Sequence, residues 1–382
     1  MIKQLQINNF RNYENVRIIM PSGEKVVVLY GANGHGKTNI LEAISLFSGS
    51  SGLRKARYED MINRNTRETY WSVTIKSGDL SLTSGYIKGE NFGRRIYKID
   101  GEPTKNSKEF AMEGSILWMT YENDRLFLES PANRRTFIDM LCAATSNSHV
   151  DNVRNYEKLT KERSKILKQF SGNRHRDTGK WLDIVENKIA DVGIQIANSR
   201  MKIVNELECT ELLTREFPRF QNKMVGPIEQ FIISQNMVLD RENYKAELTN
   251  RREKDSLVGA TTFGPNRSDW KVVHTEKQMA AEFCSAGEQK MLLSSVFFSF
   301  VRKNMQSNSG NLILLLDDVI THLDANHRAL FFKYIKELVT ENMTRVSVWL
   351  SGTDRATFEE LEDIALFFNV HDGNVIQTPA VS

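Results

Sequence analysis

Short apolar runs along the chain predict the buried strands of a parallel sheet. Val26–Tyr30, Ile116–Met119, Leu312–Leu316 and Val346–Leu350 are apolar almost throughout. They are too short for ordinary helices, and strands that helices cover on both faces have this composition. The first run lies near the N-terminus and the last two near the C-terminus, so distant parts of the chain are expected to share one sheet.

A second group of segments alternates apolar and polar residues, which is typical of strands with one buried face. It comprises Lys3–Phe10, Val16–Ile19, Trp71–Ile75, Leu80–Ile87 and Arg95–Ile99. Glycine-containing turns at 77–79 and 88–91 separate the last three. We expect an antiparallel β subdomain in the N-terminal part of the chain.

The middle of the chain has helical spacing, in the segments Arg134–Leu141, Val153–Phe170, Lys180–Leu213 and Asn243–Arg252. A polar, glycine-containing stretch at 171–179 separates the two longest segments, which predicts an antiparallel helical hairpin. One apolar stripe is expected to be a packing seam rather than a ligand site. It consists of Trp181, Ile184, Val185, Ile189, Val192 and Ile196.

In chain order, these patterns predict an α/β domain that is interrupted by a helical insertion. We expect residues 1–123 and 256–382 to form the two parts of the α/β domain, and 124–255 to form the insertion. The chain has 382 residues, 40% of them hydrophobic and 26% charged, as in a soluble globular protein. No apolar run is long enough to span a bilayer, so no membrane association is expected.

The net charge and the cysteine content give little information about function. The net charge of +3 gives no argument for a polyanionic partner, because such binding depends on local clusters. Cys142, Cys209 and Cys284 are few and far apart, so neither a disulfide framework nor a cysteine zinc site is predicted. The chain starts with a strand pattern rather than a signal peptide, and we expect a cytoplasmic protein.

The strand Val26–Tyr30 leads into a loop that matches G-x-x-x-x-G-K-[ST] at every fixed position, and the helical pattern Ile40–Phe47 follows. The glycines let backbone N–H groups point inward, and the helix N-terminus adds positive potential, so the loop would bind a phosphate chain. Lys37 would reach the β- and γ-phosphates, and Thr38 would bind Mg²⁺. An ordinary glycine-rich turn is the alternative. The predicted nucleotide-binding residues are Gly31, Ala32, Asn33, Gly34, His35, Gly36, Lys37 and Thr38.

Such a loop requires an acidic group that holds the metal, usually at the end of a neighbouring buried strand. The run Leu312–Leu316 ends in Asp317 and Asp318. We expect Asp317 to hold Mg²⁺ through its water shell, and Asp318 to accept a proton from the attacking water or to orient it. Alternatively, the pair could be a helix N-cap with a solvated neighbour.

Between these features lies Ser285-Ala286-Gly287-Glu288-Gln289-Lys290, at the start of the apolar helix pattern Met291–Val301. A serine there caps the helix, and the glycine allows backbone N–H groups to approach a phosphate. Taken alone, the hexapeptide reads equally as a capping box. Its position between the loop and the acidic strand end favours a nucleotide signature.

Together these motifs resemble the ABC-type ATPase heads of the SMC group, and more closely the RecF family of bacterial DNA replication and repair proteins. The resemblance covers nearly the full length and includes Asn9–Tyr13, Asn39–Ile44, Ser130–Asp139, Tyr156–Leu159, Gly264–Asp269, Leu314–Val319 and Leu323-Asp324. It implies a P-loop ABC-ATPase head with an antiparallel β subdomain and a helical insertion domain.

In such heads, two subunits sandwich ATP between the phosphate loop of one and the signature of the other. The resemblance therefore implies that Ser285, Gly287 and Gln289 contact ATP bound at a partner's loop, and that Arg11 and Asn12 line the nucleotide. It implies ATP and Mg²⁺ as cofactors, an ATP-driven homodimer, and weak, DNA-stimulated ATP hydrolysis that serves as a switch.

The resemblance also implies binding to double-stranded and gapped DNA, with a role at gaps and single-strand/double-strand junctions in recombinational repair and replication restart. RecR, with RecO, is the expected protein partner. Each basic candidate for DNA-phosphate contact could instead be a solvated surface charge. The candidates are Arg54, Lys55, Arg57, Arg134, Arg135, Arg174 and Arg176.

Several residues depart from the family pattern. His35 stands where glutamine is usual, Thr321-His322 replaces Ser-Glu, Asn266 stands where histidine is common, and Ser351–Asp354 replaces a Thr-Thr-Thr-Asp-like run. One alternative function is that of another SMC-like ATPase coupled to a nuclease or effector partner. A small-molecule kinase is a third class, but it would not require the signature.

Overall fold

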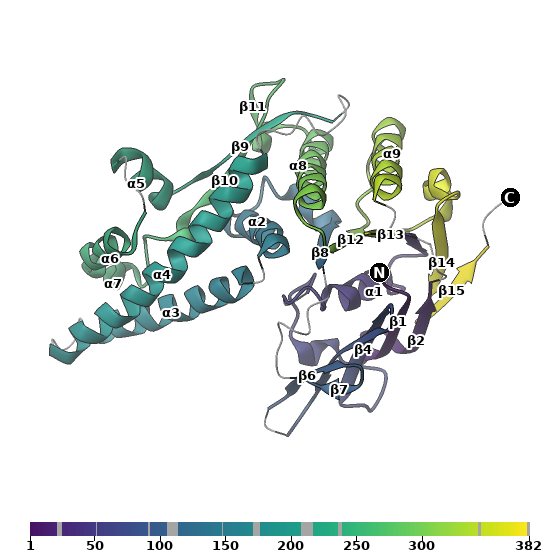
Figure 1. Cartoon of the computed structure of the whole chain (residues 1–382), viewed down its shortest axis with the longest axis horizontal. Helices are drawn as coiled ribbons and strands as arrows, with labels where there is room; N and C mark the ends of the chain where they lie inside the picture. The colour runs from purple at the N-terminus through teal and green to yellow at the C-terminus, as the bar shows by residue number, and fades with distance from the viewer. Residues whose placement is uncertain are drawn as a thin grey trace. The chain divides into compact units, whose positions relative to one another are not determined.

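The computed structural model describes residues 1–20, 25–50, 52–90, 92–104, 114–146, 148–170, 176–207, 217–235, 239–342 and 345–379 (Figure 1). The chain forms two compact units. Met1–Asp124 and Arg302–Ser382 make up the first unit, and Arg125–Val301 the second. The sequence predicts a return to the α/β domain at 256, whereas in the structure the first unit resumes at 302.

The first unit contains a largely parallel sheet with the strand order β15-β14-β3-β13-β12-β8, in which the β14–β15 pair is antiparallel. The four apolar runs singled out in the sequence form β3, β8, β12 and β13. The bounds are β3 (Val26–Tyr30), β8 (Gly114–Thr120), β12 (Asn311–Asp317), β13 (Val346–Gly352), β14 (Ala365–His371) and β15 (Asn374–Thr378). The end of β3 and the end of β12 therefore reach the same edge of the sheet.

Helices lie on both faces of this sheet, which is why its strands are apolar almost throughout. Figure 1 shows α1 (Lys37–Ser45) and α9 (Ala325–Glu341) on opposite faces. The α1 face shares a core with the antiparallel sheet, in which Leu29, Ile44 and Leu315 are fully buried. Helix α9 begins after Asp324, whose carboxylate accepts a hydrogen bond from the His327 N–H at 2.9 Å.

The predicted antiparallel subdomain is confirmed, with the strand order β2-β1-β4-β5-β6-β7. Residues paired across its strands, such as Val73 and Ser84, lie on the same face of the sheet. Along β4, more buried and more exposed side chains alternate, as the sequence pattern requires. The bounds are β1 (Gln4–Phe10), β2 (Tyr13–Ile19), β4 (Tyr70–Ser77), β5 (Leu80–Ile87), β6 (Arg94–Ile99) and β7 (Glu102–Pro103), with short helices η1 (Tyr58–Met61), η2 (Tyr121–Arg125) and η5 (Arg355–Leu361) elsewhere in the chain.

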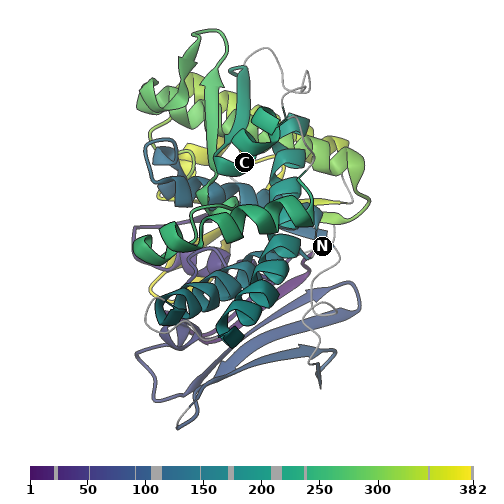
Figure 2. The ribbon, with the colours of Figure 1, turned by 90° about the vertical axis from the view of Figure 1, so that its left-hand side faces the viewer.

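The second unit is mainly helical, and its two longest helices pack against each other as the predicted hairpin (Figure 2). The helices are α2 (Pro131–Thr145), α3 (His149–Phe170), α4 (Arg176–Leu207), α5 (Pro227–Gln235), α6 (Arg241–Asn250), α7 (Arg252–Val258) and α8 (Ala286–Ser307), the last of which continues into the first unit. Among the described residues, no helix is long and apolar enough to cross a membrane.

A small sheet explains why residues beyond 255 belong to the helical unit. Its order is β11-β10-β9, so that β10 pairs with β9 from the insertion. The Arg134 guanidinium on α2 also grips the Asp269 carboxylate at 2.7 and 2.9 Å. The bounds are β9 (Phe220–Val225), β10 (Asp269–His274) and β11 (Met279–Ala280), with η3 (Pro265–Arg267) and η4 (Ala281–Phe283) beside them.

The predicted seam on α4 is only partly correct. Val185, Ile189 and Ile196 are at most 2% exposed, as expected for a packing seam. Trp181 and Ile184, however, are 61% and 55% exposed. In the same turns Leu182, Val185 and Glu186 are buried, so Trp181 and Ile184 lie outside the buried face of α4, and the spacing misplaces one side of the seam.

Candidate nucleotide site

The loop between β3 and α1 has the backbone conformation that its glycines suggest. Gly31, Gly34 and Gly36 have φ angles of +148°, +85° and +109°. A Cβ at Gly31 would lie 2.3 Å from the Val370 carbonyl oxygen, and one at Gly36 would lie 2.5 Å from the Asn12 amide nitrogen. Glycine is therefore required both for the turn and for the close packing around it.

Lys37 holds the loop in shape from within. Its side chain is buried, at 4% exposed, and its amine donates hydrogen bonds to the carbonyl oxygens of Gly31 and Ala32 at 2.7 and 3.0 Å. Burial lowers the pKa of Lys37, while the nearby carboxylates of Asp317 and Asp318 act in the opposite direction. A positive charge inside a ring of backbone groups is suited to binding a polyphosphate.

Asp317, at the end of β12, meets the start of α1. Its Oδ1 accepts a hydrogen bond from the Thr38 hydroxyl at 3.0 Å and from the Ser351 hydroxyl at 2.7 Å. Burial is the main cause that raises the pKa of Asp317, and the charge of Asp318 adds to it, against these two hydrogen bonds. The Thr38 hydroxyl and the Asp317 carboxylate thus offer oxygen ligands of the kind that Mg²⁺ prefers.

Asp318 has an unusual backbone and an unpaired side-chain oxygen. Its φ angle is +53°, in the left-handed region that non-glycine residues rarely occupy. Its N–H donates to the Ser351 hydroxyl at 2.9 Å, which fixes this geometry. Its Oδ1 is buried and has no hydrogen-bond partner among the described residues, and that Asp318 acts on an attacking water stays a prediction.

The turn between β1 and β2 packs against the phosphate loop. Asn12 donates to the His35 carbonyl oxygen at 3.0 Å, and the Tyr13 hydroxyl donates to the Gly36 carbonyl oxygen at 2.9 Å. The Arg11 guanidinium instead donates two hydrogen bonds, of 2.6 and 2.8 Å, to the fully buried Glu42 carboxylate on α1. Asn12 therefore lies against the loop, whereas Arg11 braces α1. That either residue lines a nucleotide stays a prediction.

The signature lies at the start of α8 in the second unit. Ser285 and Glu288 form a reciprocal capping box, with 2.8 Å from the Ser285 N–H to the Glu288 carboxylate and 3.4 Å in the other direction. Hydrogen bonds from Lys277 and from Ser285 hold the pKa of Glu288 at about 2. Ser285 and Gly287 are exposed, and no heavy atom would lie within 4 Å of a Cβ at Gly287. An incoming anion could therefore reach this helix start.

Gln289 behaves differently from its neighbours in the signature. It is 3% exposed, and its side-chain amide donates to the Cys284 carbonyl oxygen at 2.8 Å. Its contact with a nucleotide stays a prediction. The structure gives Gln289 the role of bracing the turn that presents Ser285.

Comparisons with known proteins identify the family. The model described as RecF/RecN/SMC N terminal domain matches residues 1–364. The DNA replication and repair protein RecF of Mesorhizobium japonicum is 34% identical over 381 residues, which cover 98% of this chain and 97% of the relative. This chain belongs to the RecF family. RecF of Rickettsia prowazekii is 33% identical over 358 residues, which cover 92% of this chain and 94% of the relative.

Solved structures agree on the fold of this RecF-family chain. The recombination mediator protein RecF of the RecFOR pathway, in its ATPrS form, gives a TM-score of 0.81 at 22% identity, and covers 99% of this chain and 98% of that chain. An SMC head domain from Pyrococcus furiosus gives a TM-score of 0.51 at 16% identity, covering 99% and 96%. The predicted fold class, a P-loop ABC-ATPase head, is confirmed.

The basic residues that the RecF resemblance suggested for DNA contact fall into distinct groups. Arg134 is 5% exposed and bound to Asp269, so its predicted DNA contact is replaced by a structural role. Arg135 is partly buried and donates to the Ser268 carbonyl oxygen at 2.8 Å. Arg174 lies outside the described residues, and Arg176 lies at the start of α4, where its side chain is not described.

The basic loop after α1 remains accessible in this RecF-family head. Arg57 is 82% exposed, with Glu59 at 3.7 Å, and Lys55 is also exposed. Arg54 is 40% exposed and donates to the Asn39 side chain at 2.7 Å, while its guanidinium also lies 3.4 Å from Glu42. This loop keeps the ability to meet phosphates, which stays a prediction.

Some residues that shape the site were given no role in it from the sequence, although Ser351 was noted as a departure from the family pattern. Ser351 binds Asp317 and the Asp318 backbone, and the parallel register puts it opposite Asp317. The sequence feature that could have given Ser351 a role in the site was its position directly after the apolar run Val346–Leu350. Glu42 and Tyr13 gave no comparable signal, because each acts through a partner that is distant in sequence.

Proposed function

We propose that this chain is an ATP-dependent, double-stranded DNA-binding protein of recombinational repair and replication restart, which acts as a recombination mediator at gaps and single-strand/double-strand junctions. One observation carries the proposal. The first unit holds a complete phosphate loop with its acidic partners, and the second unit presents an exposed signature at a helix start. Membership of the RecF family supports the link to DNA.

In this proposal, the phosphate loop binds ATP through its backbone N–H groups and the N-terminus of α1. Lys37 exchanges its hydrogen bonds with the carbonyl oxygens of Gly31 and Ala32 for phosphate oxygens. Thr38 and Asp317 hold Mg²⁺, which supplies charge neutralisation at the phosphates. Asp318 accepts a hydrogen bond from the attacking water and orients it, and the strained backbone holds its carboxylate in place.

A second copy of the chain completes the site. The exposed N-terminus of α8, with Ser285 and Gly287, offers backbone N–H groups and a favourable helix dipole to the γ-phosphate bound by the partner. ATP would then join two copies, and slow hydrolysis would release them. Whether ATP is bound would thus decide whether the chain is a monomer or a dimer. Hydrolysis would act as a switch between these forms rather than as a metabolic reaction.

DNA contact is proposed to be mainly electrostatic. The exposed loop residues Arg54, Lys55 and Arg57 offer cations for backbone phosphates. Such binding reads no base sequence and weakens steeply as salt increases. RecR, together with RecO, is the proposed protein partner. This rests on the family resemblance and on the RecFOR pathway that the solved RecF structures name.

The experiment is retention of a gapped duplex on a filter at low salt, with and without ATP. We expect ATP to increase retention by the wild type but not by Lys37→Ala, which cannot hold the phosphates. Lys336→Ala is the matched control, because Lys336 pairs with Asp363 at 2.8 Å on the surface of the same unit. Retention by the wild type that does not respond to ATP would refute the proposal.

A further inference from the structure

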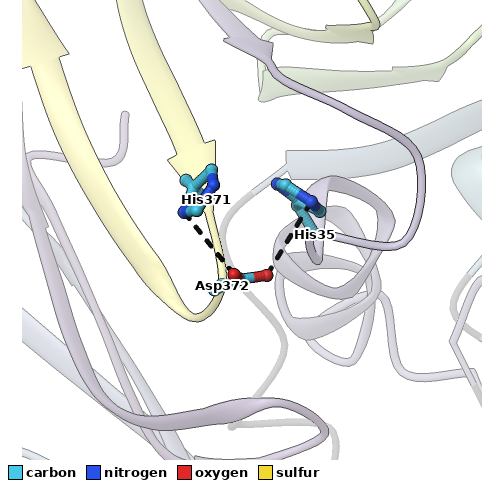
Figure 3. Close-up of side chains that lie close together, drawn as sticks. All are labelled: His35, His371 and Asp372. Carbon is cyan, nitrogen blue, oxygen red and sulfur yellow. Dashed lines mark ion pairs between the residues drawn. The ribbon is translucent and has the colours of Figure 1, made fainter.

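The phosphate loop and the β14–β15 turn bring together two histidines and an aspartate (Figure 3). His35 lies inside the loop, His371 ends β14, and Asp372 follows it. The Asp372 carboxylate lies 3.8 Å from His35 Nε2 and 3.7 Å from His371 Nδ1. The two imidazole rings are 4.6 Å apart, edge to face. The atoms of these three side chains that could bind a metal ion all lie within 4.8 Å of one another.

The backbone on both sides of this group is fixed by close packing. A Cβ at Gly31 would lie 2.3 Å from the Val370 carbonyl oxygen, and one at Gly373 would lie 2.9 Å from the Asn12 carbonyl oxygen. Asn12 in turn binds the carbonyl oxygen of His35. The phosphate loop and the β14–β15 turn therefore present their side chains from a preset frame, as a binding site requires.

The donor atoms are not used up by bonds to one another. The separations of 3.7 and 3.8 Å exceed a hydrogen bond, so the Asp372 carboxylate does not occupy His371 Nδ1 or His35 Nε2. The side chains of His371 and Asp372 are 67% and 72% exposed, so an ion can reach them and they can rotate. Tetrahedral bonds of about 2.0–2.1 Å would bring the donor atoms to roughly 3.3 Å apart, a small closure from the present spacing.

We propose that His35, His371 and Asp372 form a binding site for a divalent transition-metal ion of the zinc class. Two imidazoles and one carboxylate suit zinc, whereas Mg²⁺ and Ca²⁺ prefer oxygen donors throughout. Three protein ligands leave a coordination position open to water. The bound ion ties the phosphate loop to the β14–β15 turn and restrains the loop. The site does not depend on the proposed DNA function, and it is separate from the Mg²⁺ donors Thr38 and Asp317.

The test is titration of ZnCl₂ into the full chain without nucleotide, in phosphate-free buffer after treatment with a chelator. We expect one zinc ion per wild-type chain, and affinity about tenfold weaker or more in His371→Ala and in Asp372→Asn. His327→Ala is the matched control. His327 is half-exposed and also lies beside an aspartate, with Nδ1 2.7 Å from Asp324 Oδ2.

Hydrogen exchange localises the ion and gives a second readout. Zinc should slow the exchange of amides in Gly31–Thr38 in the wild type and in His327→Ala, but not in His371→Ala. Because the side chains of His371 and Asp372 are exposed, the variants should fold. The proposal is overturned if the wild type binds no stoichiometric zinc, if the two variants bind it as the wild type does, or if zinc leaves exchange in Gly31–Thr38 unchanged. None of these results would bear on ATP-dependent assembly.

Discussion

Asp318 combines a strained backbone with a side-chain oxygen that has no hydrogen-bond partner among the described residues. A non-glycine residue at a φ angle of +53° costs free energy, and a buried carboxylate oxygen without a hydrogen bond costs more. The Ser351 hydroxyl fixes the backbone, because it accepts a hydrogen bond from the Asp318 N–H and donates one to Asp317 Oδ1. Strain of this kind persists where the surrounding structure fixes it, and it commonly marks a functional group.

Replacing Asp318 with asparagine tests its role. Asp318→Asn keeps the size of the side chain but removes a group that can take up a proton. We expect ATP binding to persist and the hydrolysis rate to fall about 10²–10⁴-fold, as for loss of a general base. Asp240→Asn is the control, since Asp240 caps α6 in the other unit and asparagine caps equally well. Single-turnover hydrolysis at wild-type rate by Asp318→Asn would show that Asp318 has another role.

At the scale of residues, the sequence predicted the site where chemistry demands particular residue types. Lys37, Thr38 and Asp317 meet as the spacing suggested. Arg134 shows where sequence reasoning fails, because a buried arginine and a solvated one look alike in a sequence. Only the fold brings Asp269 to Arg134, and this partner decides that the arginine is structural.

At the scale of the elements, the buried cation Arg163 links several helices of the second unit. Arg163 on α3 is fully buried and donates to Glu186 on α4 at 2.9 Å, to Asp255 on α7 at 2.6 Å and to the Leu248 carbonyl oxygen on α6 at 2.7 Å. These bonds satisfy the charges that burial would otherwise penalise. One side chain thus joins four helices of the hairpin and its neighbours.

Loss of this cation should destabilise the protein strongly. Arg163→Met leaves the buried carboxylates of Glu186 and Asp255 without their shared partner, which costs about 3–5 kcal/mol of unfolding free energy. Urea denaturation measures the effect. Arg154→Met on the same helix is the control, because Arg154 is 52% exposed and lies 3.9 Å from Asp151, so we expect a change within about 0.5 kcal/mol. Equal stability of the two variants would contradict this account.

A second tie between helices makes stability depend on pH. Asp139 on α2 accepts bonds from Arg200 on α4 at 2.8 Å and contacts His149 on α3 at 2.8 Å. Burial opposes ionisation, but the charge and hydrogen bonds of Arg200, with His149, hold the pKa of Asp139 at about 2. The folded pKa lies below the ordinary value, so this stabilisation is present above that value and is lost as pH falls toward the folded pKa.

Asp139→Asn should therefore lose stability in a pH-dependent way. The charge-dependent part is worth about 2 kcal/mol. We expect the wild type to exceed the variant in unfolding free energy at pH 6, and the difference to shrink as pH falls below about 4. Urea denaturation of both proteins from pH 6 to pH 3 measures this. A difference that grows toward low pH would mean that another group carries the effect.

Elements with strong local patterns were predicted, and those that depend on distant partners were not. The apolar runs of β3, β12 and β13 and the alternation of β5 reflect burial directly. The short strand β10 was not predicted, because it is defined by its pairing with β9, which lies on the other side of α5–α7 in the sequence. For the same reason, the spacing could not show that Trp181 would be exposed.

At the scale of the whole molecule, the residues proposed to bind ATP belong to both units of the chain. The phosphate loop with Asp317 belongs to the first unit, and the exposed signature belongs to the second. Under the proposed function, this division would couple ATP binding to association, since each copy would supply what the other needs. The central claim is therefore that ATP, rather than DNA or a partner protein, drives two copies together.

Sedimentation velocity of the 43.8 kDa chain, with and without ATP and Mg²⁺, tests this claim most directly. We predict a monomer without nucleotide and a dimer with it. Ser285→Arg should bind ATP yet stay monomeric, whereas Ser130→Arg, an equivalent change at the N-cap of α2, should dimerise as the wild type does. A wild type that sediments identically with and without ATP, or a Ser285→Arg variant that dimerises normally, would contradict the account.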